Sequence, residues 1–204
     1  PLTDELGVTL LNCNVEEENA LADVVDAAVA ELGRLDFVVH SIAWAPLADL
    51  HGRIIDSSAE GFAKAMTISC HSFAELGRLC APHMPHGGSM ITMSYIGSEQ
   101  AIPNYGIMGP IKAALESTVR YMALELGGEN IRVHAVSAGP IPTRASSGLP
   151  DLDGLLHLAE SKAPMKRLVS LDEVSGLSAF LCTDQASGMT GQTLFVDAGY
   201  HIAA

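Results

Sequence analysis

The chain has 204 residues, 48% of them hydrophobic, so it can bury a full core, and we predict a single domain over residues 1–204. Its formal net charge of −13 excludes a protein that binds nucleic acid or an anionic membrane through a basic surface. No apolar stretch approaches the roughly 18–20 residues that span a bilayer, and no signal peptide opens the chain. The four cysteines stand far apart, which indicates reduced thiols in a cytoplasmic protein. The closest histidines, His83 and His86, lack a third ligand nearby, so we expect no metal site.

The first half of the chain alternates predicted strands and helices. The apolar run Val8–Val15 predicts a buried strand. Glu16–Leu32 follows as a helix, because its first turn is acidic and its apolar residues form one stripe. Leu35–Ile42 predicts a strand that is apolar on both faces, as in a parallel sheet covered by helices. After a loop over Ala43–Ile55, the apolar spacing predicts a helix over Ser58–Cys80.

The second half continues this alternation. Its predicted segments are, in order, the strand Ser89–Ser94, the helix Asn104–Leu126, the strand Ile131–Ser137, the helix Asp172–Leu181 and the strand Gly191–Asp197. Thr143–Ser170 shows only a weak helical pattern and is predicted to be irregular. The whole order predicts an α/β fold, namely a doubly wound, Rossmann-like parallel sheet with right-handed crossovers.

Such a sheet predicts where a ligand binds. Ligands of open parallel sheets lie beyond the carboxyl ends of the strands. The segments at those ends are Asn14-Val15, Ser41–Ala45, Ser94–Gly97 and Ala138–Ala145. We therefore expect these loops to converge on one crevice.

Tyr105 and Lys112 stand seven residues apart in the predicted helix that follows Tyr95. At 3.6 residues per turn, both side chains leave the same face, and the lysine can reach back toward the phenol. An ammonium beside a phenol lowers the pKa of that phenol and prepares it to stabilise an oxyanion. The alternative is a packing tyrosine and an unrelated lysine, since this spacing often arises by chance.

The amino-acid sequence around this pair resembles that of a known family. The segments HSIAWAPLADLHGR, ITMSYIGSEQAIPNYGIMGPIK, IRVHAVSAGPIPTR and SGMTGQTLFVDAGYHI resemble the NADH-dependent enoyl-acyl-carrier-protein reductases of the short-chain dehydrogenase/reductase superfamily. The superfamily's usual Tyr-x-x-x-Lys is absent, because Gly109 stands four residues after Tyr105. A tyrosine followed by lysine seven residues later marks the enoyl reductases, and the likeness covers essentially the whole chain.

The resemblance implies three catalytic roles. Tyr105 would hydrogen-bond the thioester carbonyl oxygen and stabilise the enolate that forms when hydride reaches the β-carbon. Lys112 would hold the nicotinamide ribose hydroxyls and supply positive charge near the developing anion. Tyr95 would contribute from the substrate side, with a packing tyrosine as the alternative.

The resemblance also implies binding residues. The cofactor would be NADH, and the resemblance does not exclude NADPH. The residues that would bind the cofactor are Asn14, Val15, Ile42, Lys112, Ile141, Pro142, Thr143, Arg144 and Ala145. Among them, Thr143 would contact a phosphate group. Ala45, Tyr95 and Met108 would contact the acyl chain, and a core methionine is the alternative for Met108. Small and polar residues in Ala145–Leu156 would form a mobile substrate-binding loop.

The chain departs from the family pattern in two places. Asn14 stands where the family has an aspartate that reads the adenine amino group, and an amide oxygen can still accept that hydrogen bond. No glycine-rich turn for the cofactor pyrophosphate occurs anywhere in the chain. In the family, that turn and two further strands precede the point where this sequence starts. We therefore expect a piece of a longer active enzyme, with an N-terminally truncated sheet.

The truncated sheet leads to two expectations. Without the intervening strands, Val8–Val15 either pairs directly with Leu35–Ile42 or remains loose, and cofactor affinity is weakened. The main functional prediction is reduction of trans-2-enoyl thioesters on acyl carrier protein by NADH in fatty-acid biosynthesis, by a homotetramer in the cytoplasm. The alternatives are another short-chain dehydrogenase or ketoreductase, and an impaired scaffold protein that keeps only the oligomer surface.

Overall fold

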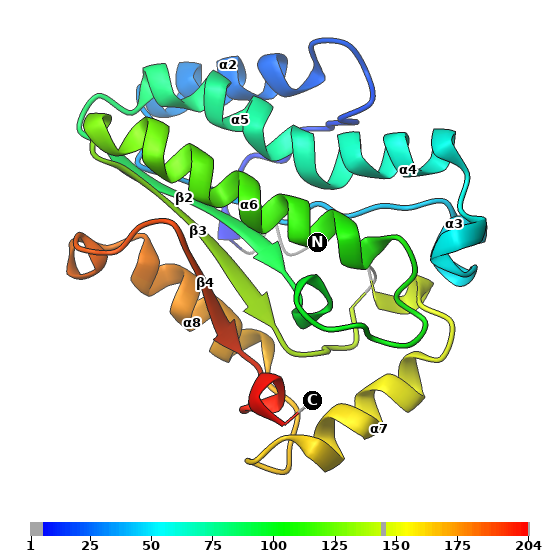
Figure 1. Cartoon of the computed structure of the whole chain (residues 1–204). Coiled ribbons are helices and arrows are strands. Elements are labelled where there is room, and N and C mark those ends of the chain that lie inside the picture. Colours follow the sequence, from blue (N-terminus) through cyan, green and yellow to red (C-terminus); the bar gives the residue numbers. More distant parts are fainter. Residues whose placement is uncertain (1–5, 144–145, 204) are drawn as a thin grey trace.

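The centre of the molecule is a parallel β-sheet. The computed structural model describes residues 6–143 and 146–203, and within them four strands lie in the order β1-β2-β3-β4 (Figure 1). The strands are β1 (Phe37–His40), β2 (Gly88–Ser94), β3 (Ile131–Ala138) and β4 (Gln192–Val196). In the register, Val39 pairs with Ile91, and Ile91 with His134. The predicted parallel α/β sheet is confirmed, with strand ends that differ by one or two residues from the predicted ones.

Helices cover both faces of this sheet (Figure 1). One layer consists of α2 (Ala20–Leu32), α4 (Ala59–Met66), α5 (Ser72–Cys80) and α6 (Met108–Leu126), with a π-helical turn over Thr67–His71 between α4 and α5. The opposite face carries α8 (Leu171–Leu181). The short α3 (Leu47–His51) and α7 (Leu152–Lys162) lie toward the carboxyl ends of the strands (Figure 1).

Alternate residues of the central strands face the two helical layers. Met90 and Ala135 belong to the core cluster that contains the buried face of α6. Their neighbours Ile91 and Val136 belong to the second cluster, which contains the buried residues of α8. Side chains of a strand alternate between the faces of a sheet, so a strand with apolar residues on both faces contributes to two cores at once.

The two crossovers that flank β3 differ in hand. The helix between β2 and β3 is α6, and the helix between β3 and β4 is α8, on the opposite face. Both crossovers advance in the same direction across a parallel sheet, so helices on opposite faces give them opposite hands. The prediction of uniformly right-handed crossovers is therefore wrong. The connection from β3 to β4 is long and includes α7, which frees it from the constraint on compact β-α-β units.

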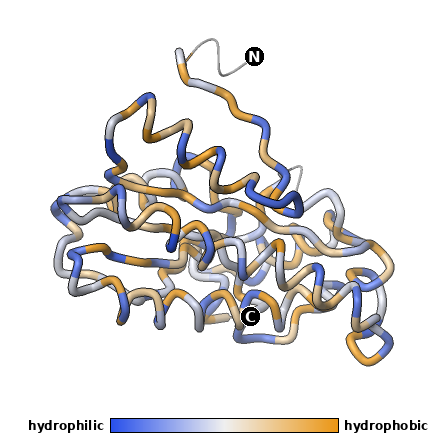
Figure 2. The backbone as a smooth tube through the Cα atoms, turned by 90° about the horizontal axis from the view of Figure 1, so that it is seen from above, coloured by the Kyte–Doolittle hydropathy of each residue, from blue (hydrophilic) through white to orange (hydrophobic). Residues whose placement is uncertain are grey.

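The predicted strand Val8–Val15 is wrong. Within the described residues this segment pairs with no strand, and the side chain of Leu10 is 77% exposed. Figure 2 shows this end of the chain running apart from the layered body. Its attachment is polar, since the Thr9 hydroxyl donates to the Glu31 carboxylate at 2.8 Å. An apolar run forms a strand only where it pairs with another backbone segment, and no segment of residues 6–143 and 146–203 pairs with this one.

Two helices begin later than predicted. The helix predicted over Asn104–Leu126 begins at Met108, because Asn104 (φ 62°) and Gly106 (φ 49°) adopt left-handed conformations that interrupt a right-handed helix. Tyr105 therefore precedes α6, and the prediction that it lies on the same helix as Lys112 is wrong. The helix predicted from Glu16 likewise begins only at Ala20.

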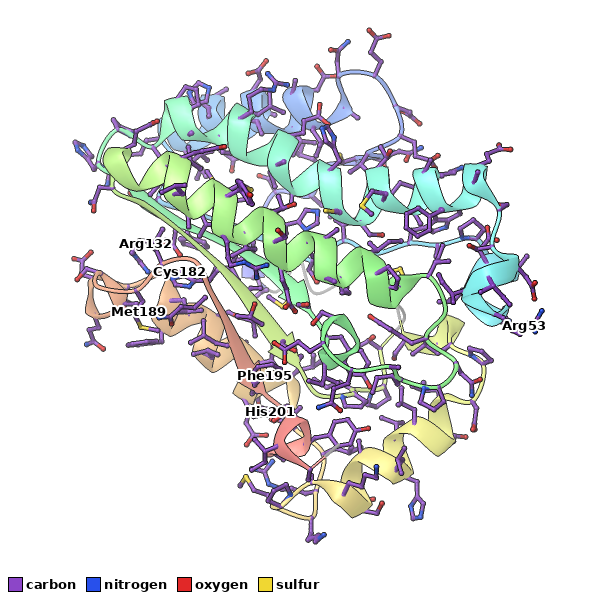
Figure 3. The ribbon with its side chains drawn as sticks, in the orientation of Figure 1. Arg53, Arg132, Cys182, Met189, Phe195 and His201 are labelled. Carbon is purple, nitrogen blue, oxygen red and sulfur yellow. The ribbon has the colours of Figure 1, made fainter. Side chains whose placement is uncertain are left out.

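The remaining predictions concern the second half of the chain. Thr143–Ser170 is more ordered than predicted, since it contains α7. Figure 3 places Phe195 and His201 at the carboxyl end of β4, where their rings stack with centroids 4.1 Å apart. Arg132 and Cys182 lie at the opposite end of the sheet (Figure 3). No helix in the described ranges is long and apolar enough to cross a membrane.

Candidate active site

A cavity of about 840 Å³ opens at the carboxyl ends of the strands. Its walls come from the segments that follow β1, β2 and β3, from the start of α6 and from the region between residues 146 and 155. Val174 of α8 closes one side. The predicted convergence of loops at this edge of the sheet is confirmed for the segments after these three strands. Most of the lining is apolar, which suits a site that holds an alkyl chain.

Tyr95 and Tyr105 form an aromatic pair in the wall of this cavity. Their ring centroids lie 4.9 Å apart with an edge-to-face angle of 63°. Gly97 permits this arrangement, because a Cβ at this position would come within 2.5 Å of the Tyr105 ring. The buried Tyr95 hydroxyl has no hydrogen-bond partner within the described residues. A buried hydroxyl without a partner is costly, so Tyr95 is a candidate to contact a bound molecule.

Lys112 reaches the same cavity from the first turns of α6. Only 5% of the residue is exposed, and its Nζ donates a hydrogen bond to the Met93 carbonyl oxygen at 2.7 Å. Burial lowers the pKa of Lys112 to about 8, while Cys70 and Glu116 act in the opposite direction. The ammonium is therefore still the main form at neutral pH.

The predicted effect of Lys112 on the Tyr105 phenol is wrong. The pKa of Tyr105 is raised, first by burial and then by its neighbours Tyr95 and Glu116. Since the lysine head is bonded to the Met93 carbonyl, the phenol does not gain a charge partner that outweighs its loss of solvent. Tyr105 consequently stays protonated, and it can act as a hydrogen-bond donor but not as a phenolate.

The structure brings most of the predicted site residues together. The cavity is lined by Ile42, Ala45, Tyr95, Tyr105, Met108, Lys112, Ile141 and Thr143. Asn14, Val15 and Pro142 do not line it, and Asn14 instead bonds its own neighbours Glu16 and Glu17. Arg144 and Ala145 fall outside the described residues. The predicted adenine-side contacts are thus not assembled in this structure.

Sequence reasoning missed several lining residues and one residue behind the wall. Trp44, the single tryptophan, lies at the cavity, with the Lys64 ammonium 4.8 Å from its ring centroid. Leu149, Leu152 and Leu155 form an apolar wall before and within α7. Glu116, one turn after Lys112, is also buried. The sequence could have indicated Glu116, because it places a carboxylate on the apolar face of a predicted helix, and acidic side chains are almost never buried without partners.

The described part of the predicted substrate-binding loop (Ala145–Leu156), residues 146–156, contributes lining residues to the cavity. Ser146–Gly148 forms a single 3-10 turn before α7 begins at Leu152. The Gly148 carbonyl oxygen accepts a hydrogen bond from Nε2 of His51 in α3, at 2.7 Å. This hydrogen bond joins the loop to α3. Movement of this loop remains a prediction.

Comparison with known proteins places the chain in a family. The family model described as "Enoyl-(Acyl carrier protein) reductase" matches residues 1–201. The chain belongs to this family. An NADH-dependent enoyl-acyl-carrier-protein reductase of Nostoc sp. is 47% identical over 94% of this chain and 74% of that protein. One from Rhizobium meliloti is 43% identical over 98% of this chain and 74% of that protein.

Solved enoyl reductases share the fold of this family member. A crystal structure from Anaplasma phagocytophilum, described as a complex with NAD, matches with a TM-score of 0.94 and 42% identity over 99% of this chain and 78% of that chain. A Bacillus cereus reductase, described with NADP+ and an indole naphthyridinone, gives a TM-score of 0.95 and 38% identity over 100% of this chain and 80% of that chain. The predicted family and the Rossmann-like fold are confirmed. That the chain is a piece of a longer reductase remains a prediction.

Proposed function

We propose that this chain reduces trans-2-enoyl thioesters of acyl carrier protein to acyl thioesters with NADH, as a step of fatty-acid biosynthesis. The observation that carries the proposal is the placement of Tyr105 and Lys112 in one largely apolar cavity at the carboxyl ends of a parallel sheet. A hydrogen-bond donor, a buried cation and an apolar wall are what the reduction of an enoyl thioester requires. Family membership supports the same reaction.

The residues present fit the nicotinamide end of the cofactor. An ammonium has three N–H donors, and Lys112 commits one to the Met93 carbonyl, which leaves donors for ribose hydroxyls. Tyr95, whose buried hydroxyl has no hydrogen-bond partner within the described residues, lines the same cavity. When bound, NADH supplies the hydride. The cavity offers fewer predicted contacts for the adenine end of the cofactor, because Asn14 and Val15 do not line it.

Tyr105 would act as a neutral hydrogen-bond donor. Because burial raises its pKa, the phenol keeps its proton and can donate to the thioester carbonyl oxygen as negative charge develops there. Lys112 would add positive charge at the same end of the cavity. Met108 and Ala45 would line the acyl chain and exclude water, which strengthens both interactions.

We also propose that the chain acts as a homotetramer in the cytoplasm, with the carrier-protein-linked thioester as its partner and without nucleic acid or membrane. All cysteines in the described residues are free thiols, which suits a reducing compartment. Tyr121 and Leu124 lie three residues apart on one face of α6 and are 66% and 80% exposed, and adjacent exposed apolar side chains of this kind are found at interfaces.

The first experiment compares the chain with its Tyr105→Phe variant. We expect NADH to bind both with similar affinity, measured by its fluorescence. We expect turnover of a crotonyl thioester to fall about 10²–10³-fold in the variant, because one oxyanion donor is lost. Tyr121→Phe, on the exposed side of α6, is the matched control and should keep its activity. Wild-type turnover by Tyr105→Phe would contradict the assignment of the donor, and failure of the wild-type chain to reduce the thioester would contradict the proposed reaction.

A further inference from the structure

Glu116 is a buried carboxylate that the proposed mechanism does not use. It lies one turn after Lys112 on α6, and only 5% of the residue is exposed. Residues four apart on a helix share a face, so Glu116 follows Lys112 toward the cavity wall. A buried charge is costly unless hydrogen bonds and an opposite charge compensate it, so the burial of Glu116 has to be explained by its partners.

Two serines bind the Glu116 side chain. The Ser94 hydroxyl donates to Oε1 at 2.5 Å, and the Ser98 hydroxyl donates to the same oxygen at 2.7 Å. Ser94 ends β2 and Ser98 ends the 3-10 turn Ile96–Ser98, so the two serines lie on either side of Tyr95. The carboxylate therefore ties the turn that carries one tyrosine of the site to the helix that carries its lysine.

Titratable groups of several neighbouring elements interact with this network. Glu116 raises the pKa of both Tyr105 and Lys112, and Tyr95 acts on Tyr105 from the turn after β2. Cys70, from the π-helical turn, raises the pKa of Lys112. His40, from β1, is itself influenced by the charge of Lys112. Among these groups Glu116 is the one carboxylate, so its charge offsets part of the burial that works against the ammonium.

We propose that Glu116 is a positioning residue for enoyl reduction. Its negative charge keeps Lys112 in the ammonium form, and its bonds to Ser94 and Ser98 hold the turn with Tyr95 against α6. This inference rests on the proposed function for its consequence in turnover. Its physical part, the effect on Lys112, does not depend on catalysis.

Glu116→Gln is the decisive variant. Both serine hydroxyls donate to a single oxygen, so the glutamine amide oxygen can accept both bonds at the same volume while the charge is lost. We expect the titration midpoint of Lys112 to fall by about one pH unit, which is the size of effect that a nearby opposite charge has. Glu125→Gln, on the exposed side of the same helix, is the matched control and should leave the midpoint unchanged.

The readout is the NMR titration of lysine Cε carbons in the full chain labelled with ¹³C. The chain has four lysines, so Lys112 can be assigned with a Lys112→Met variant while Lys64, Lys162 and Lys166 serve as internal references. An unchanged Lys112 midpoint in folded Glu116→Gln would overturn the proposed charge effect. A wild-type chain without enoyl reductase activity would contradict the proposed function and leave this titration interpretable.

Turnover and a second variant test the positioning part. A one-unit shift predicts kcat/KM for the crotonyl thioester about tenfold lower at pH 9, and nearly unchanged at pH 6.5, in Glu116→Gln. Ser98→Ala removes one of the two bonds but keeps the carboxylate, so we expect lower turnover with an unshifted Lys112 midpoint. It also provides the test if Glu116→Gln does not fold. Full turnover by Ser98→Ala at all pH values would overturn the positioning role.

Discussion

His40 shows how burial controls the charge of single residues around the cavity. The residue lies at the end of β1, is 1% exposed, and is held between the Thr92 hydroxyl at Nδ1 (2.9 Å) and the Ser72 hydroxyl at Nε2 (2.8 Å). Ser72 donates its own proton to the Ile68 carbonyl, so we assign Nε2 as the donor to Ser72. Burial, and then the charge of Lys112, lower the pKa of His40 from 6.5 to about 4.

This shift predicts a pH dependence of stability. Between about pH 6.5 and pH 4 the unfolded chain binds a proton at His40 that the folded chain excludes, so stability is lost as the pH falls through this window. We expect the wild-type chain to lose about 2 kcal/mol more than His40→Gln between pH 7.5 and pH 4.5, in urea unfolding at each pH. His86→Gln, at an exposed site, should follow the wild type. Equal losses in wild type and His40→Gln would show that His40 titrates normally in the folded state.

Helix α8 illustrates how a single element is fixed in place. Its N-cap, Ser170, accepts a hydrogen bond from the Glu173 N–H at 3.2 Å, and the Glu173 carboxylate accepts one from the Ser170 N–H at 2.9 Å. Arg167 binds the same carboxylate through two bonds, of 2.8 and 2.6 Å. The hydrogen bonds from Arg167, and then the one from the Ser170 backbone N–H, lower the pKa of Glu173 to about 2. The Glu173 carboxylate of this capping box therefore stays charged in ordinary buffers.

The contribution of the Ser170 N-cap to the free energy of unfolding can be measured. We expect Ser170→Ala to lower the free energy of unfolding by about 1 kcal/mol, because one N–H of the first turn loses its partner. Ser175→Ala lies on the exposed side of the same helix and should change stability by less than about 0.5 kcal/mol. Urea denaturation followed by circular dichroism compares the two variants. A Ser170→Ala variant as stable as Ser175→Ala would show that the cap does not hold α8 in place.

At the scale of the whole molecule, helix α6 has one buried face and one exposed face. The interior of α6 packs on β3, while its outer face exposes Leu124. If this face builds the proposed tetramer, light scattering should give a mass close to four chains of 21.4 kDa. Leu124→Asp should reduce that mass, because a charge would be buried in the interface. Leu32→Asp on α2, which is similarly exposed, should leave it unchanged. A monomeric wild-type chain, or a Leu124→Asp variant with the wild-type mass, would contradict this interface.

The sequence by itself determined the class of fold and most of the site. Strands with apolar residues on both faces, such as Ile131–Ser137, are expected between two helical layers, and the positions of the strand ends then place Ile42, Tyr95 and Ile141 around one crevice. The segments around Tyr105 and Lys112, together with the spacing of this pair, likewise carried the resemblance to the reductase family. These features are local or follow from strand order, and local patterns can be read without coordinates.

Only the tertiary structure decided the remainder. Val8–Val15 has the composition of a strand but pairs with no strand in the described part of the chain, and pairing is a property of two segments. The left-handed conformations of Asn104 and Gly106 place Tyr105 before α6. The Lys112 ammonium donates a hydrogen bond to the Met93 carbonyl oxygen. The phenol pKa therefore rises where spacing alone predicted a fall. Desolvation depends on every atom that surrounds a group, so the charge states of this site follow from packing and cannot be read from the spacing of two residues.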